Sequence, residues 1–166
     1  MCAFQKKTLK IVSGGQTGVD RTALDCAIAF GLDHGGWCPR GRIAADGVIA
    51  EKYRLRETES DSYPERTYRN IRDSDATLIF AESLPLTGGT LLTAFLTAEK
   101  EKPSLTILAD LPVREAVEKT RVFLARESVK TLNIAGPRAS VETSRLLSFV
   151  REVLGRLFDD QDASEL

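Results

Sequence analysis

Short apolar runs alternate with segments of helical periodicity along most of this chain, and this alternation constrains its fold more than any other feature. The runs that we predict to be strands are 9–13, 34–38, 76–81, 104–109 and 131–135. The segments that we predict to be helices are 20–30, 64–72, 90–100, 113–126 and 141–158. Strands that alternate with helices join through right-handed crossovers into a parallel sheet. The sequence therefore predicts a three-layer α/β fold, an open parallel sheet with helices on both faces.

The helical periodicity also predicts which side chains reach the core. In segment 90–100 the expected core positions are Leu91, Leu92, Ala94, Phe95 and Ala98. Segment 39–63 has no clear period and contains turn-forming residues, Gly41, Asp46 and Gly47. Such a long connection either carries function or packs as a small substructure.

Length and composition are those of one soluble domain, with 166 residues, 42% hydrophobic and 28% charged. We expect this domain to span 1–166, with its core at about 8–158 and a frayed tail at 159–166. The formal net charge of -1 argues against a nucleic-acid partner, which normally requires a basic excess. No apolar run reaches the ~20 residues that span a bilayer. The first residues also lack the apolar core of a signal peptide, so we expect no membrane partner and a cytoplasmic location.

The sequence offers few residues for metal binding or nucleophilic catalysis. Its only histidine is His34, and its cysteines, Cys2, Cys26 and Cys38, form no CxxC pair. We therefore expect no structural metal site, no disulfide framework and no catalytic triad, and we assign no catalytic residue. Cys26 fits a core position, whereas Cys38 is either an inert packed thiol or a reactive one.

The clearest candidate site is a glycine-rich turn between the first predicted strand and helix. A strand that turns through glycines into a helix directs backbone N–H groups at one point, where they can bind an anion. The candidate residues of this turn are Gly14, Gly15, Gln16, Thr17, Gly18, Asp20 and Arg21. Their spacing matches neither a Walker A loop nor the dinucleotide fingerprint, so a tight turn without a ligand is the alternative. We expect Gly15→Val to abolish ligand binding while the fold persists.

Other candidates follow later strands and should meet the first turn at one edge of the sheet, because ligands bind beyond the carboxyl ends of parallel strands. A second glycine turn contributes Gly88, Gly89 and Thr90, and a third turn contributes Gly136 and Arg138. Trp37 could stack on a flat ring, while Arg40 and Arg42 suit phosphate or carboxylate groups. Alternatively, Trp37 is a buried anchor beside solvated arginines. Further along, Arg66 and Asn70 share one helix face.

Together these motifs resemble the molybdenum cofactor carrier proteins. The resemblance rests on the segments 13–21, 36–42, 46–47, 66–70, 74–77, 88–90 and 133–138, and extends over roughly residues 8–157. This family is similar to the SLOG superfamily of nucleotide-ligand binders, which also contains the LOG proteins, and is regarded as a circularly permuted branch. The resemblance implies a Rossmann-like fold.

The resemblance also implies a function and partners. The expected cargo is the molybdenum cofactor (molybdopterin), a pterin with a phosphate, or a nucleotide. The expected partners are this small phosphorylated ligand, a molybdoenzyme acceptor and further copies of the chain in a dimer or tetramer. Alternatives are a LOG-like phosphoribohydrolase acting on a nucleoside monophosphate, and a nucleotide-sensing regulator. The LOG pattern places a glutamate where Thr93 stands here, so we favour a carrier over an enzyme.

Overall fold

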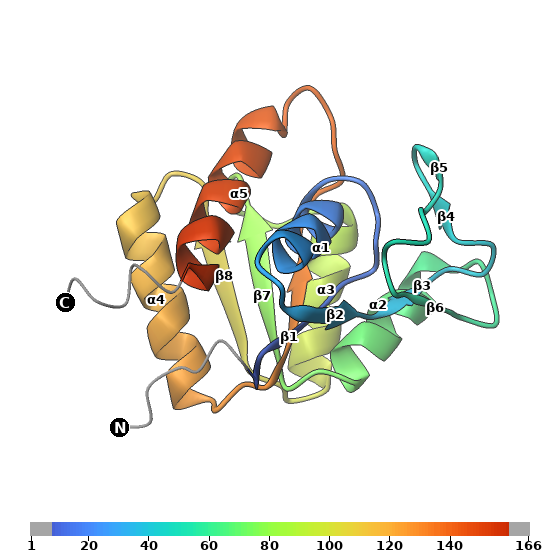
Figure 1. Ribbon diagram of the computed structural model, residues 1–166, viewed down its shortest axis with the longest axis horizontal. Helices are drawn as coiled ribbons and strands as arrows, with labels where there is room; N and C mark the ends of the chain where they lie inside the picture. The colour runs from blue at the N-terminus through green and yellow to red at the C-terminus, as the bar shows by residue number, and fades with distance from the viewer. Residues whose placement is uncertain (1–7, 160–166) are drawn as a thin grey trace.

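The computed structural model describes residues 8–159 and has a five-stranded, all-parallel sheet at its centre (Figure 1). The strand order is β2-β1-β9-β7-β8. The strands are β1 (Lys10–Val12), β2 (Asp33–Gly35), β7 (Ala76–Ala81), β8 (Ser104–Leu108) and β9 (Thr131–Ala135). The helices are α1 (Val19–Ala29), α2 (Tyr63–Arg72), α3 (Gly88–Glu99), α4 (Val113–Arg126) and α5 (Ser144–Phe158). This open Rossmann-like α/β fold confirms the predicted fold class.

Helices cover both faces of the sheet. On one face α5 packs between α1 and α4, and on the other face α3 packs against β7 and β8 with α2 beside it (Figure 1). All residues of β7 are buried, as expected for an inner strand of a parallel sheet. The sheet and α5 meet at two aromatic rings. Phe80 of β7 contacts Phe149 of α5 edge to face, with ring centroids 6.4 Å apart.

The predicted strand 34–38 is two separate strands in the structure. The chain leaves the sheet at Gly36, whose φ is 125°, and continues as β3 (Trp37–Cys38), which pairs with β6 (Arg56–Glu57). A Cβ at Gly36 would lie 2.3 Å from the carbonyl oxygen of Ser13, so only glycine fits this bend. The bend directs the following residues away from the main sheet.

Residues 39–60 form a projection that we call the arm. It contains a short antiparallel hairpin, β4 (Ile43–Ala44) and β5 (Gly47–Val48), which extends beside the sheet (Figure 1). The guanidinium of Arg42 donates to carbonyl oxygens within the arm, those of Ile49, Ala50, Tyr53 and Leu55, at 2.9 to 3.2 Å. The arm is therefore a small packed substructure and not an irregular loop.

The predicted core positions of α3 are wrong. The buried side chains of this helix are the polar ones, Thr90, Thr93 and Thr97. Leu91 and Phe95 are 51% and 63% exposed, and Ala98 is exposed as well. The apolar period predicted an inward face, but the threonine side lies toward the sheet, where the Thr97 hydroxyl is 3.5 Å from the hydroxyl of Thr77 in β7. Among residues 8–159, no helix is long and apolar enough to span a membrane.

Candidate functional site

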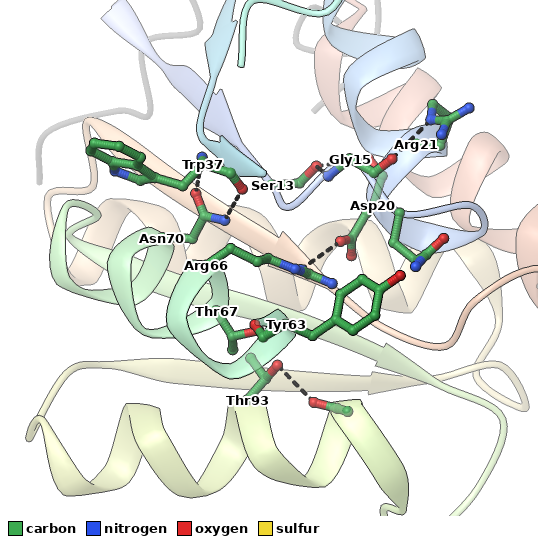
Figure 2. A network of polar contacts seen from close by, with 12 residues as sticks. Ser13, Gly15, Asp20, Arg21, Trp37, Tyr63, Arg66, Thr67, Asn70 and Thr93 are labelled. Carbon is green, nitrogen blue, oxygen red and sulfur yellow. Dashed lines mark hydrogen bonds and ion pairs between the residues drawn. The ribbon is translucent and has the colours of Figure 1, made fainter. Parts of the chain in front are cut away.

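A pocket of about 240 Å³ lies where the turns after β1, β7 and β9 meet helix α2. The predicted site residues that line it are Gln16, Asp20, Arg66, Gly89, Thr90, Gly136 and Arg138. These residues come from four separate parts of the sequence, and the parallel sheet brings them to one edge. Figure 2 shows Asp20 and Arg66 at the centre of this region, with Tyr63 and Thr93 nearby.

Gln16 lines the pocket and carries an unpaired hydrogen-bond donor. Its carboxamide oxygen accepts the backbone N–H groups of Thr17 at 2.9 Å and Ala45 at 2.8 Å. Because both neighbours are donors, the oxygen must face them and the Nε2 amino group must point the other way. Nε2 has no hydrogen-bond partner among the described residues, although the side chain is only 6% exposed. A buried donor in this position favours an acceptor group on a ligand.

The N-terminus of α3 adds backbone donors to the same pocket. The first N–H groups of a helix have no partner within the helix and lie at the positive end of its dipole. No side chain of the described residues caps this terminus, and both Gly89 and Thr90 line the pocket. A Cβ at Gly89 would meet no atom within 4 Å, so this part of the pocket is open. An anion fits here because it accepts from several donors at once.

Asp20 and Arg66 form a buried ion pair at the pocket wall (Figure 2). The Nη1 atom of Arg66 lies 3.0 Å from Oδ2 of Asp20, and the Asp20 side chain is only 5% exposed. Burial raises the pKa of Asp20, while the Arg66 charge and the N–H groups of Gln16 and Gly14 act in the opposite direction. A Cβ at Gly14 would lie 1.8 Å from Nη1 of Arg66, so glycine is required for the guanidinium to fit.

The backbone N–H groups of the first turn are largely occupied by the protein's own atoms. Those of Gly14 and Gln16 lie close enough to the Asp20 carboxylate to act on its pKa, which they lower. The N–H of Gly15 donates to Ser13 Oγ at 3.3 Å, and that of Val19 donates to the carbonyl of Pro137 at 3.1 Å. The first turn therefore lacks the free cluster of amides that its glycines predict, and the open donors are those of α3 and of the Gln16 side chain.

Comparison with known proteins places this arrangement in a family. Residues 11–158 match the profile of the circularly permutated YpsA SLOG family. The chain belongs to this family. Its structure is similar to a crystal structure named "Putative molybdenum carrier protein" from Syntrophus aciditrophicus SB, with a TM-score of 0.86 and 38% sequence identity over 92% of this chain and 96% of that chain. No curated protein matches the chain.

Several predicted residues of this SLOG chain lie outside the pocket. Arg21 donates to the carbonyl of Gly15 and forms an ion pair with Asp46 of the arm at 3.1 Å. Gly15 faces the arm, where a Cβ would lie 2.4 Å from Leu55 Cδ1, so the expected tolerance of Gly15→Val is wrong. The other predicted residues that do not line the pocket are Gly14, Thr17, Gly18, Trp37, Arg40, Arg42, Asn70 and Gly88.

The ring of Trp37 contacts side chains of the protein itself, whereas one prediction had it stack on a flat ring of a ligand. The guanidinium carbons of Arg56 and Arg69 lie 4.2 and 4.7 Å from its ring centroid. Its indole N–H donates to Asp73 at 2.8 Å, and its backbone pairs with the side chain of Asn70 (Figure 2). Trp37 thus attaches β3 to α2 in this SLOG chain.

A small polar cavity continues inward from the pocket. Its volume is about 10 Å³, which is close to the space of one water molecule. The predicted residues Gly14 and Asn70 line it, together with Asp20 and Arg66. It adjoins the buried Nε atom of Arg66, which has no hydrogen-bond partner among the described residues.

The sequence prediction missed six residues of the pocket: Tyr63, Thr67, Leu92, Thr93, Ala135 and Pro137. A usable signal existed for two of them, because Tyr63 and Thr67 precede Asn70 at helical spacing and share its face. Among residues 8–159, no group of three or more His, Cys, Asp or Glu side chains is arranged to hold a metal ion. Both described cysteines are buried, and burial raises the pKa of the Cys38 thiol.

Proposed function

We propose that this SLOG protein is a carrier that binds the phosphorylated pterin of the molybdenum cofactor, or a related nucleotide-like anion, in the pocket between α2 and α3. The observation that carries this proposal is the unpaired Nε2 donor of Gln16 in the same pocket as the uncapped N-terminus of α3. Both features require an acceptor, and a phosphate group supplies several.

The pocket fits the phosphate end of such a ligand better than the whole molecule. Its volume of about 240 Å³ lies below the ~300–1,000 Å³ typical of pockets that enclose an entire small molecule. The phosphate would bind at Gly89, Thr90 and Gln16, with Arg138 at the exposed rim to offset its charge. The ring system would extend outward, where an acceptor enzyme can reach it.

The name of the similar structure from Syntrophus aciditrophicus agrees with this cargo. Molybdenum is part of the cargo in this proposal and not a resident metal of the protein. The carrier would release the intact cofactor to a molybdoenzyme, which is the partner that the proposal requires.

The hydrolase alternative has less support. Cleavage of an N-glycosidic bond requires a carboxylate that is free to act beside the ribose. Among the described residues that line the pocket, Asp20 is the one acid, and its carboxylate is already paired with Arg66 and lies close to two backbone N–H groups. Thr93, where the LOG pattern has its glutamate, bonds through its hydroxyl to the carbonyl of Gly89.

The proposal includes self-association. Helix α3 has its polar threonines toward the sheet, while Leu91 and Phe95 are exposed on its outer side with Leu84 close by in sequence. Exposed apolar patches of this kind usually mark an interaction surface. We assign this surface to a second copy of the chain, in a dimer or tetramer.

Native mass spectrometry of freshly purified protein, combined with a thermal-shift screen of nucleotides and pterin phosphates, tests the carrier function. We expect a retained phosphorylated molecule or a rise in melting temperature that depends on ligand concentration. Incubation with AMP should release no free adenine. Release of adenine, or the absence of any shift with every phosphorylated compound, would contradict the carrier function.

A further inference from the structure

The most unusual feature of the pocket is that the protein supplies its own anion to the first glycine turn. The carboxylate of Asp20, from the first turn of α1, lies beside this turn, where the N–H groups of Gly14 and Gln16 favour its charged form, as such groups favour a bound phosphate. The turn therefore has the form of an anion site that is already filled.

The Asp20 carboxylate is held firmly in this place. Arg66 donates to its Oδ2 from α2 at 3.0 Å, and the absence of a side chain at Gly14 lets the guanidinium approach. The Ser13 hydroxyl donates to the backbone carbonyl of Asp20 at 3.0 Å and accepts the N–H of Gly15. These two bonds connect the glycine turn to the first turn of α1. Several elements thus cooperate to keep the carboxylate in the turn.

Asp20 also lines the pocket that contains the N-terminus of α3. In the proposed function the first phosphoryl group binds at the N-terminus of α3, beside Gly89 and Thr90, which belong to a different element from Asp20. A second phosphoryl group, attached to the first and directed toward the first turn, would approach the buried carboxylate. Two like charges a few ångströms apart in a partly buried site repel strongly.

We infer that Asp20 is a specificity-determining residue, which restricts the pocket to ligands with a single terminal phosphoryl group and rejects diphosphates. This inference rests on the proposed function and specifies its ligand class. A pterin or nucleoside monophosphate satisfies the restriction. A nucleoside diphosphate, or a dinucleotide joined by a diphosphate, does not.

Isothermal titration calorimetry in metal-free buffer tests the inference, with AMP against ADP and phosphate against pyrophosphate as probe pairs. We expect the wild-type protein to bind each monophosphate probe more than about tenfold more tightly than its diphosphate counterpart. Asp20→Ala should remove most of this difference, because it empties the turn and frees Arg66. Where Asp20→Ala fails to fold, the isosteric Asp20→Asn takes its place.

Asp46→Asn is the matched control, because it also removes one acid near the first turn but leaves the pocket lining intact. This variant should keep the wild-type preference for the monophosphate probes over the diphosphate probes. Equal affinity of the wild-type protein for AMP and ADP would overturn the inference and leave anion binding in place. A preference that survives in both Asp20 variants would also overturn it. Failure of the wild-type protein to bind any of the four probes would instead contradict the proposed function, and the inference with it.

Discussion

The carboxamide of Gln16 connects the pocket to the tip of the arm, since its oxygen accepts the backbone N–H of Ala45 at 2.8 Å. Its nitrogen has no partner among residues 8–159, and the residue lines the pocket. Hydrogen bonds at the two ends of an amide polarise each other. A ligand acceptor on Nε2 should therefore strengthen the bond to Ala45.

Gln16→Glu should weaken binding of a phosphorylated probe such as AMP by more than about tenfold. The glutamate keeps an oxygen for Thr17 and Ala45 but replaces the pocket donor with a second carboxylate oxygen, which repels the phosphate. Calorimetry measures the loss, and circular dichroism checks the fold. Asp46→Asn, which weakens the attachment of the arm through Arg21 without altering the pocket, should bind the probe like wild type. Equal binding by Gln16→Glu would exclude Nε2 as a ligand contact.

Two glycine substitutions should separate folding from binding. Gly14→Ala places a methyl group 1.8 Å from Nη1 of Arg66, so we expect a loss of about 1–3 kcal/mol in the free energy of unfolding as well as weaker binding. At Gly89 the added methyl group has open space and suits the helix, so stability should stay unchanged or rise by up to ~1 kcal/mol.

Gly89→Ala nevertheless adds a methyl group at a residue that lines the pocket, at the N-terminus of α3. We expect this variant to bind AMP more weakly than wild type despite its intact fold. Chemical denaturation and calorimetry on the same samples distinguish the two effects. An alanine at position 89 that leaves binding unchanged would argue against the phosphate position that we propose.

Asp73 should make the stability of the protein sensitive to acid. Hydrogen bonds from Arg72, and from the indole of Trp37, lower the pKa of this carboxyl to about 2. Because the folded pKa lies below the unfolded value of about 3.9, the stabilisation is present above pH ~4 and is lost as the pH falls toward 2. The melting temperature of wild type should therefore exceed that of Asp73→Asn at pH 6, and the gap should narrow as the pH falls from 4 to 2. A difference in melting temperature that stays constant between pH 4 and 2 would show that the stabilisation by Asp73 does not depend on its negative charge.

Self-association through α3 can be tested at Phe95, which is 63% exposed. Phe95→Glu adds a charge to the outer face and should shift the mass measured by light scattering toward that of a monomer. Val122→Glu is the matched control, because Val122 is similarly exposed, at 55%, but lies on α4. A wild-type protein that is monomeric at high concentration would contradict the assignment of this surface.

The fold could be predicted because the apolar runs and the helical periods are long and regular. Helix α4 shows this clearly, since the residues at helical spacing along one side, Ala116, Val117, Thr120, Phe123 and Leu124, are all buried. Helix α3 shows the limit of the same reasoning. In α3 the apolar period includes Leu91 and Phe95, which are exposed, while the buried side chains are threonines, so periodicity alone does not show which side of a helix faces the sheet.

The candidate site was predictable in its position but not in its detail. Strand ends and glycine turns indicated the edge of the sheet at which Gln16, Arg66 and Gly89 line one pocket. The sequence could not show that Asp20 fills the first turn, because this depends on Arg66 arriving from a helix 46 residues away. Arg42 was misleading for a similar reason, since an arginine that binds carbonyl groups of its own loop looks the same in sequence as one that binds phosphate.

The attachment of Trp37 to α2 has a practical consequence. It is the single tryptophan of the chain, and its contacts with Asn70 and Asp73 lie on or directly after the helix that carries Arg66. We expect its fluorescence emission to change when a ligand binds beside α2. Such a change would allow a titration to be followed without any label.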